Sequence, residues 1–254
     1  TLINALLGKK LMPTANEATT ATIVRIVDTE QDHFSAVAYN SNNEIIENIE
    51  KVTLEDMKRL NSDEKIFKIE LKGKIPFVET VGMKLVLVDT PGPNNARDTR
   101  HQDITYKMID NSDKTLLLYV MNGQQLGIND EKVFLDYVCE KMKEGGKQGR
   151  ERFIFAVNKM DAFKPKDEGE DCIERALTNV KKGLESRGIY NPNIFPISAG
   201  VALELRTDDD EPRALDFFKR GIQKYKALHF DNYYQFSNLP LSTHKRIEGM
   251  LENA

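Results

Sequence analysis

The segment FAVNKMD, residues 155–161, decides the fold that we expect of this chain. It joins an apolar run to a polar turn that contains Asn158, Lys159 and Asp161. Short continuous apolar runs are typical of strands that are buried on both faces of a parallel sheet. Strands that alternate with helix-length segments predict an α/β fold. Three further runs of this kind are KLVLVD (84–89), KTLLLYVMN (114–122) and NIFPIS (193–198).

The polar turn at the end of this segment suits recognition of a guanine base. The carboxylate of Asp161 can accept two hydrogen bonds at once. Guanine offers N1–H and an amino group side by side, whereas adenine does not, and a site built on those bonds rejects the wrong base. We expect Lys159 to lay its stem along the base and Asn158 to tie neighbouring loops together. The alternative is a polar loop that merely follows a strand.

A weaker signal of the same site lies after the last apolar run. Ser198 and Ala199 follow that run directly. Small residues at this point would let a backbone N–H approach the guanine carbonyl. Ser-Ala-Gly is also common loop material, so the signal gains its weight from its order after the other motifs.

The stretch DTPG, residues 89–92, suggests a site for phosphate and metal. Ligands of open α/β sheets bind at the carboxyl ends of strands, and Asp89 ends an apolar run. A carboxylate in that place can hold Mg²⁺, usually through water. Gly92 would give its backbone N–H close access to a terminal phosphate. The alternative interpretation is a simple turn.

Threonines in the segment NEATTATI, residues 16–23, are candidates for a residue that reaches both Mg²⁺ and the terminal phosphate. Thr19, Thr20 and Thr22 compete for this role, and we prefer Thr19. The alternative for each is a threonine that only leads into the next strand.

Composition excludes several classes of protein. The chain has 254 residues, of which 40% are hydrophobic and 30% charged, with a net charge of −4. This charge is not that of a nucleic-acid-binding protein, and we expect no direct binding to nucleic acid. Cys139 and Cys172 lack metal-ligand spacing and favour a reducing, cytoplasmic location. No apolar run approaches the roughly 20 residues of a membrane-spanning helix.

Other patterns predict the remaining elements. Residues 1–7 have helical apolar spacing, and a helix with Thr53 as its cap and Asp56 three residues on is expected to follow residue 53. We expect strands in residues 21–27 and 33–39, an edge strand or extended connector in 65–71, and amphipathic helices around residues 133–138, 173–184 and 215–225.

These elements in this order resemble the GTPase domain of the P-loop class, and more closely the dynamin family, especially its bacterial members. TLINALLG (1–8) is similar to the helix that follows a Gly-Lys-Ser phosphate loop in that family. LMPTANEATTA (11–21) is similar to its first switch, and DTPGPNNARDTRHQDIT (89–105) to its second. YVMNGQQLGINDEKVFL (119–135) resembles the strand and helix that come next.

The resemblance implies a three-layer P-loop GTPase fold. Its sheet is mostly parallel with one antiparallel edge strand, and helices cover both faces. Residues 1–239 would form the GTPase (G) domain, with the phosphate loop expected just before Thr1. Residues 240–254 would form a C-terminal helix at which a stalk or neck begins.

The resemblance also implies binding of GTP and GDP and hydrolysis of GTP. Asp89 and Thr19 would hold Mg²⁺, while Thr19 and Gly92 would sense the γ-phosphate as catalytic residues. The backbone N–H of Thr1 would face the α-phosphate. The nucleotide-binding residues that read the base would be Asn158, Lys159, Asp161, Ser198 and Ala199. In dynamin relatives a monovalent cation offsets charge. Their G domains pair across the nucleotide, which implies a homodimer here. The family also implies peripheral contact of the full-length protein with a membrane.

The position after Gly92 leaves the catalytic mechanism open. Many switch GTPases place a Gln there to position the attacking water, whereas this chain has Pro93. The attacking water must therefore be oriented in some other way. Since the phosphate loop is not among these residues, a pseudo-GTPase is one alternative, and a nucleotide-gated scaffold that docks a replication or division protein is another. A monomeric small-GTPase-like switch is a further alternative, which the long insert between Asp28 and Leu85 disfavours.

Overall fold

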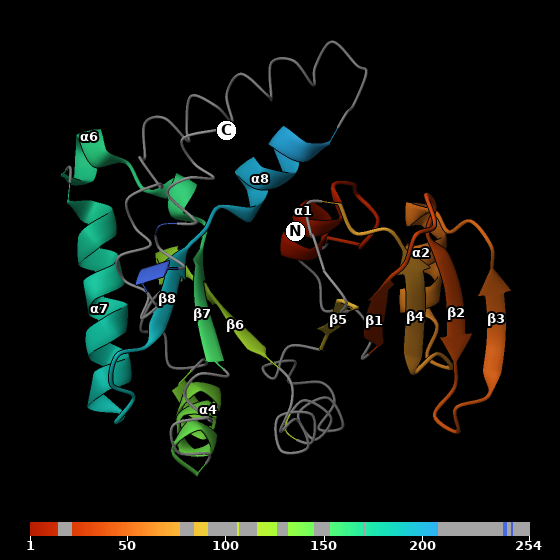
Figure 1. Ribbon diagram of the computed structural model, residues 1–254, viewed down its shortest axis with the longest axis horizontal. Coiled ribbons are helices and arrows are strands. Elements are labelled where there is room, and N and C mark those ends of the chain that lie inside the picture. Colours follow the sequence, from red (N-terminus) through yellow and green to blue (C-terminus); the bar gives the residue numbers. More distant parts are fainter. Residues whose placement is uncertain are drawn as a thin grey trace. The chain divides into compact units, whose positions relative to one another are not determined.

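The chain divides into two compact units, each with its own sheet and its own core. Unit 1 comprises Thr1–Met108 and Arg206–Asp210, and unit 2 comprises Ile109–Leu205 and Glu211–Ala254. The computed structural model (Figure 1) describes residues 1–14, 22–76, 84–90, 106, 116–125, 132–144, 153–169, 171–207, 241–242 and 245.

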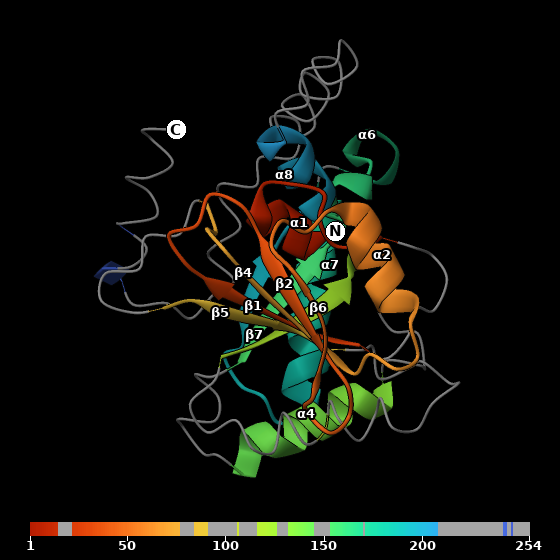
Figure 2. The ribbon, with the colours of Figure 1, turned by 90° about the vertical axis from the view of Figure 1, so that its right-hand side faces the viewer.

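Unit 1 is built on a mixed five-stranded sheet with the strand order β3-β2-β4-β1-β5. Strands β1 and β4 pair in parallel, whereas β1–β5, β2–β3 and β2–β4 pair antiparallel. In both views α2 lies beside β2 and β4 (Figures 1 and 2). The elements of unit 1 are α1 (Leu2–Leu7), β1 (Ile23–Asp28), β2 (Ser35–Tyr39), β3 (Ile45–Ile49), α2 (Leu54–Ser62), β4 (Lys68–Gly73) and β5 (Val86–Asp89).

Most local predictions for unit 1 are confirmed. Thr53 caps α2 in a reciprocal capping box with Asp56. The expectation of an edge strand or connector in residues 65–71 is wrong, since β4 lies between β2 and β1. Its Ile69 and Leu71 are fully buried, which explains the central position. The edge strands are β3 and β5. The sequence did not predict β3, whose Ile45 and Ile46 are exposed.

Unit 2 contains a three-stranded parallel sheet with the order β6-β7-β8. Three of the four apolar runs form this parallel sheet, as predicted, and the α/β class is confirmed. The fourth run, residues 84–89, was expected in the same sheet, but its strand β5 pairs antiparallel with β1 in unit 1. In unit 1 antiparallel pairing extends beyond a single edge strand. The elements that follow in the chain are β6 (Leu117–Asn122), η1 (Gly123–Gln125), α4 (Lys132–Glu144), β7 (Phe153–Asn158), η3 (Met160–Ala162), α6 (Pro165–Glu168), α7 (Cys172–Ser186), β8 (Asn193–Pro196) and α8 (Ala199–Arg206).

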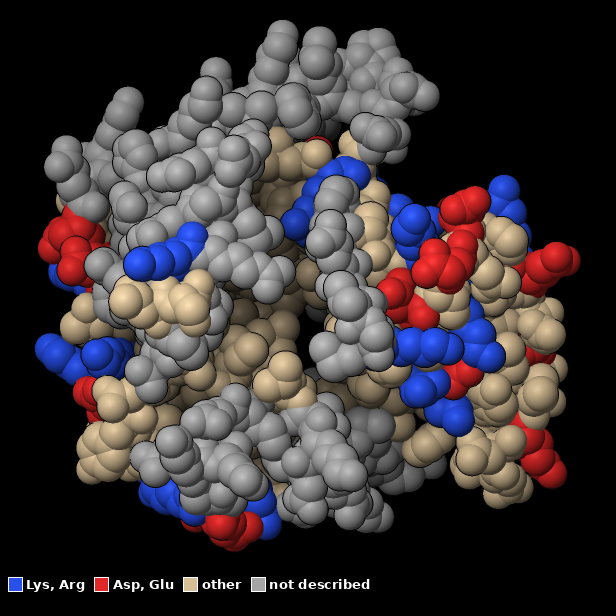
Figure 3. Space-filling model, viewed as in Figure 1, with Lys and Arg blue, Asp and Glu red and all other residues tan. Residues whose placement is uncertain are grey.

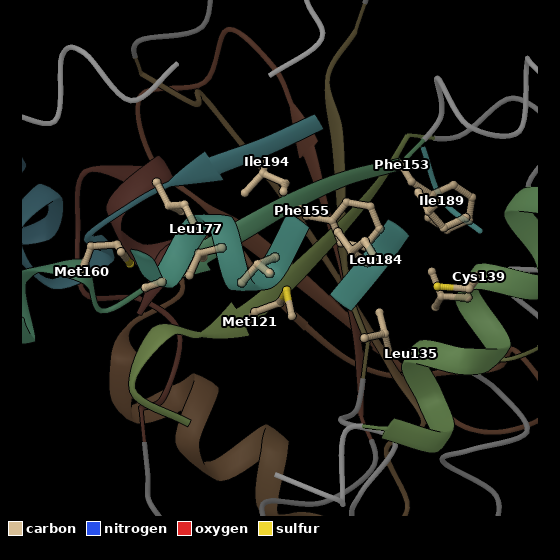
Figure 4. Close-up of a cluster of buried hydrophobic side chains, with 14 of the residues drawn as sticks. Met121, Leu135, Cys139, Phe153, Phe155, Met160, Leu177, Leu184, Ile189 and Ile194 are labelled. Carbon is tan, nitrogen blue, oxygen red and sulfur yellow. The ribbon is translucent and has the colours of Figure 1, made fainter. Parts of the chain in front are cut away.

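The core of unit 2 lies between its sheet and helices α4 and α7. Figure 4 shows Phe155 of β7 and Leu177 and Leu184 of α7 within one cluster of buried side chains. Cys139 and Cys172 are free and buried, and burial raises the pKa of the Cys139 thiol to about 11. The helices predicted around residues 133–138 and 173–184 are confirmed as α4 and α7. The helix predicted around 215–225 lies outside the described residues.

Strands β5 and β6 depart from the expectation of burial on both faces. On β6, Leu118 and Val120 are 49% and 44% exposed, while Met121 faces the core. On β5, Val88 is 44% exposed. Within the described residues, each strand is therefore covered on one face only. A run of apolar residues does not by itself show how many faces are covered.

The described surface of unit 1 carries interspersed charges. On the face in Figure 3, acidic and basic side chains alternate over the part that holds β2, β3 and α2. Charged side chains of unit 1 also form ion pairs, as Arg59 does with Glu47 at 2.7 Å and Arg25 with Glu70 at 2.6 Å. Among the residues that the structure describes, no helix is long and apolar enough to cross a membrane.

A buried asparagine fixes the chain that leaves α1. The helix ends at Gly8, whose φ of 64° is left-handed and suits glycine. The Asn4 side chain donates through Nδ2 to the carbonyl of Met12 at 2.8 Å. Its Oδ1 accepts from the N–H groups of Leu11 at 3.0 Å and Met12 at 2.7 Å. Asn4 therefore holds the start of the segment that leads to the candidate threonines.

Replacement of Asn4 by alanine is expected to lower the free energy of unfolding by about 3 kcal/mol, because three buried backbone groups lose their partner. Asn48→Ala on the exposed side of β3 is the control, with an expected change within about 0.5 kcal/mol. Urea unfolding of both variants measures the difference. Equal unfolding midpoints for N4A and N48A would contradict the role assigned to Asn4.

Candidate functional site

The loops that follow β7 and β8 are tied together by the side chain of Asn158. Its Oδ1 accepts from the backbone N–H of Ala199 at 3.0 Å and from that of Lys159 at 2.8 Å. The neighbouring strands β7 and β8 run parallel, so both loops leave the same edge of the sheet (Figure 1). The structure thus brings three of the predicted base-reading residues together, in the arrangement expected for Asn158.

Backbone hydrogen bonds fix the same two loops. The N–H of Ile197 donates to the carbonyl of Val157 at 2.8 Å, and the N–H of Met160 donates to the carbonyl of Ile197 at 3.3 Å. Lys159 lies between them with a left-handed φ of 64° and an exposed side chain. A non-glycine residue in that conformation is uncommon and tends to occur at functional sites.

Asp161 is oriented by Ser198. The Ser198 hydroxyl donates to Oδ1 of Asp161, and its Oγ also accepts from the N–H of Val201 at 3.4 Å. Ser198 is 8% exposed and directly precedes α8, so the carboxylate is held from a fixed helix end. The sequence prediction gave Ser198 and Ala199 a different task, namely a backbone N–H aimed at the guanine carbonyl. The Ala199 N–H is already bonded to Asn158.

Asp89 occupies the last position of β5, where it is the register partner of Val24. Its carboxylate keeps exposed surface, yet the protein around it disfavours the charge. Burial accordingly raises the pKa of Asp89 above its ordinary value. The backbone nitrogen of Thr1 lies near Asp89 in unit 1, and a carboxylate in this environment gains from a cation.

Of the three candidate threonines, only Thr22 lies within the described residues. It is 7% exposed, and its hydroxyl lies 3.5 Å from the carbonyl of Ile66. This position supports the start of β1 and makes Thr22 a poor candidate for contact with a phosphate. Thr19 and Gly92, which we predicted as catalytic residues, lie outside the described residues.

The sequence pattern missed two residues that hold segments in place: Asn4, which holds the segment after α1 in unit 1, and Gly123, which lies against the turn after β7 in unit 2. Asn4 is the one polar side chain within the apolar stretch LINALL, and that exception was the available signal. Gly123 gave no signal beyond being a glycine after a strand. The part of the chain that the structure describes contains no cluster of three or more His, Cys, Asp or Glu that could hold a metal.

Comparisons with known proteins give one family. A sequence profile described as "Dynamin family" matches residues 1–160. A protein of Caldicellulosiruptor sp. (strain Rt8B.4), "Uncharacterized protein in xynA 3'region", is 26% identical over 255 residues, which cover 99% of this chain and 58% of that protein. "Probable transmembrane GTPase FZO-like, chloroplastic" of Arabidopsis thaliana is 29% identical over 120 residues, or 47% of this chain and 12% of that protein.

A solved structure shares the fold. It is described as "An oligomerised bacterial dynamin pair provides a mechanism for the long range sensing and tethering of membranes". The match has a TM-score of 0.56 at 16% identity and covers 99% of this chain but 40% of that one. This chain therefore spans less than two thirds of the length of each of these three proteins.

Asp89→Asn is expected to stabilise the protein at neutral pH in the absence of nucleotide and metal. The raised pKa means that the folded state holds its proton more tightly, so the wild type loses stability as pH rises from the ordinary Asp range through the raised pKa. Asparagine avoids that cost. Urea unfolding between pH 3 and pH 7 measures the difference in free energy of unfolding between the wild type and D89N. A D89N variant that is less stable than the wild type at pH 7 would contradict the expectation.

Proposed function

The chain belongs to the dynamin family, and from this membership we propose that it binds GTP and GDP and hydrolyses GTP as the G domain of a larger protein. The family match and the shared fold support guanine-nucleotide chemistry in general. The observation that carries the proposal is the set of contacts that join Asn158, Ser198 and Asp161 at one edge of the unit 2 sheet.

The base-reading part of the proposal rests on the carboxylate of Asp161. The donor Ser198 fixes its orientation, and a carboxylate can accept from both N1–H and the amino group of guanine. Asn158 keeps the two loops in register, and the exposed Lys159 can lie along the plane of the base. A base without these two donors would leave the carboxylate poorly matched, which gives discrimination against adenine.

The metal part of the proposal rests on Asp89 together with Thr19. Carboxylate and hydroxyl oxygens are hard ligands of the kind that Mg²⁺ prefers. The environment that disfavours the charge of Asp89 fits a cation beside it. When bound, Mg²⁺ would neutralise charge on the phosphates. Thr19 and Gly92 would sense the γ-phosphate, and the backbone N–H of Thr1 would face the α-phosphate.

Hydrolysis needs parts beyond those residues. Pro93 follows Gly92 in the sequence and offers no side-chain donor to the attacking water. We propose that a phosphate loop, a monovalent cation and a second G domain complete the site in the full-length protein, which acts as a homodimer. The names of two similar proteins refer to membranes, and we propose that the full-length protein is cytoplasmic and associates peripherally with a membrane.

Asp161→Asn is expected to exchange guanine preference for xanthine preference. Because Ser198 donates to Oδ1, the new amide would place its oxygen there and its NH₂ toward the base. That NH₂ opposes the guanine amino group but can donate to the C2 carbonyl of xanthine. GDP affinity should fall about 100-fold while XDP affinity rises.

Calorimetric titration of the full-length protein with GDP, XDP and ADP measures this exchange. Asp167→Asn on the exposed surface of α6 is the matched control and should leave all three affinities unchanged. If D161N and D167N bind GDP equally well, Asp161 does not read the base. Equal wild-type affinity for GDP and ADP would reject the proposal as a whole.

Hydrolysis by a G-domain dimer should increase faster than linearly with protein concentration, because pairing completes the site. GTP turnover of the full-length protein, measured from about 0.1 to 10 µM in the range of typical association, tests this. Slow turnover that stays proportional to concentration, or none at all, would instead identify a nucleotide-gated scaffold or a pseudo-GTPase.

A further inference from the structure

Gly123 lies against the base-reading turn with no room for a side chain. It follows β6 directly, and its neighbour Asn122 is the register partner of Asn158. A methyl group on Gly123 would lie 2.9 Å from the backbone carbonyl oxygen of Asn158 and 3.0 Å from Sδ of Met160. It would also lie 3.3 Å from Cε2 of Phe163. The first two separations are shorter than ordinary van der Waals contact.

The groups that Gly123 touches belong to the turn itself. The Asn158 carbonyl is part of the peptide that leads into Lys159, whose backbone is left-handed. Met160 is fully buried and begins η3, which contains Asp161. The methionine side chain could shift by rotation, but the carbonyl oxygen can retreat only if the peptide moves. Such a movement would disturb the contacts of Asn158 with the neighbouring loop.

The other side of this contact is also held in place. Oδ1 of Asn122 accepts from the N–H of Gln124 at 3.2 Å, and Nδ2 of Asn122 donates to Oε1 of Gln125 at 2.7 Å. These bonds close η1 into a compact turn, and Gly123 within it is buried. A methyl group at position 123 would therefore press against the fixed Asn158 carbonyl, and η1, which carries position 123, is itself held in place and cannot readily retreat.

We propose that Gly123 is a positioning residue for guanine recognition, which it serves by letting η1 seat directly against the turn of Asn158, Lys159 and Asp161. The inference rests on the proposed function of that turn. Gly123 touches no base itself. It sets the height of the Asn158–Lys159 peptide, and through that peptide the direction of the Asp161 carboxylate.

Gly123→Ala in the full-length protein tests the proposal, with Gly200→Ala as the matched control. Gly200 lies on α8 and has no part in the proposed base contacts, and a methyl group there would meet nothing within 4 Å. Calorimetric titration with GDP and with IDP, whose base lacks the 2-amino group, measures both affinity and the use of the second hydrogen bond. G123A should weaken GDP binding about tenfold, and the GDP-to-IDP affinity ratio should fall, while G200A changes neither.

Amide hydrogen exchange of the nucleotide-free variants gives a readout that does not require a ligand. The N–H groups of Lys159 and Ala199 donate to Asn158, so they should exchange faster in G123A than in G200A. An overall loss of folding would instead speed exchange throughout unit 2, including the buried β7 residue Phe155.

Three results would overturn the inference. G123A could bind GDP as tightly as G200A with the same GDP-to-IDP ratio. It could lose GDP and IDP affinity equally with unchanged exchange at Lys159 and Ala199, or it could unfold unit 2 as a whole. If the wild type shows no preference for GDP over ADP, the proposed function fails instead, and the exchange comparison alone then decides whether Gly123 positions the turn.

Discussion

The site depends on the side-chain oxygen of Asn158, which accepts hydrogen bonds from two backbone N–H groups. One donor, Lys159, belongs to its own loop, and the other, Ala199, belongs to the loop after β8. Parallel strands bring two loops to one edge of a sheet but do not fix their relative height. The amide of Asn158 supplies that constraint together with the backbone hydrogen bonds of Ile197 and Met160, and Ser198 can then reach Asp161.

Packing beneath these loops makes the constraint rigid. Met160 lies below the turn with no exposed surface and belongs to the same buried cluster as Phe155 and Leu177. Close-packed interiors resist small displacements, so the polar groups above the cluster are held by the core as well as by their hydrogen bonds. In unit 1, Asn4 plays a comparable part, because one buried amide holds the segment that leads away from α1.

Sequence alone predicted the features that follow from local pattern. Local residue type and spacing were enough to predict the turn after β7, the strand that ends at Asp89 and the Thr53 cap. The central place of β4 and the existence of β3 were not, since pairing order depends on contacts between distant residues. The role proposed for Gly123 could not be predicted for a related reason. It depends on contact with the Asn158 carbonyl, which the pairing of β6 with β7 brings close.

The most direct test of the central claim is a crystal structure of the full-length protein with GDP and Mg²⁺. We expect the Asp161 carboxylate to lie within hydrogen-bond distance of guanine N1 and of the amino group, with Ser198 still donating to Oδ1 and Asp89 beside the hydrated metal. A base bound away from the loops of β7 and β8, with Asp161 facing solvent, would contradict it.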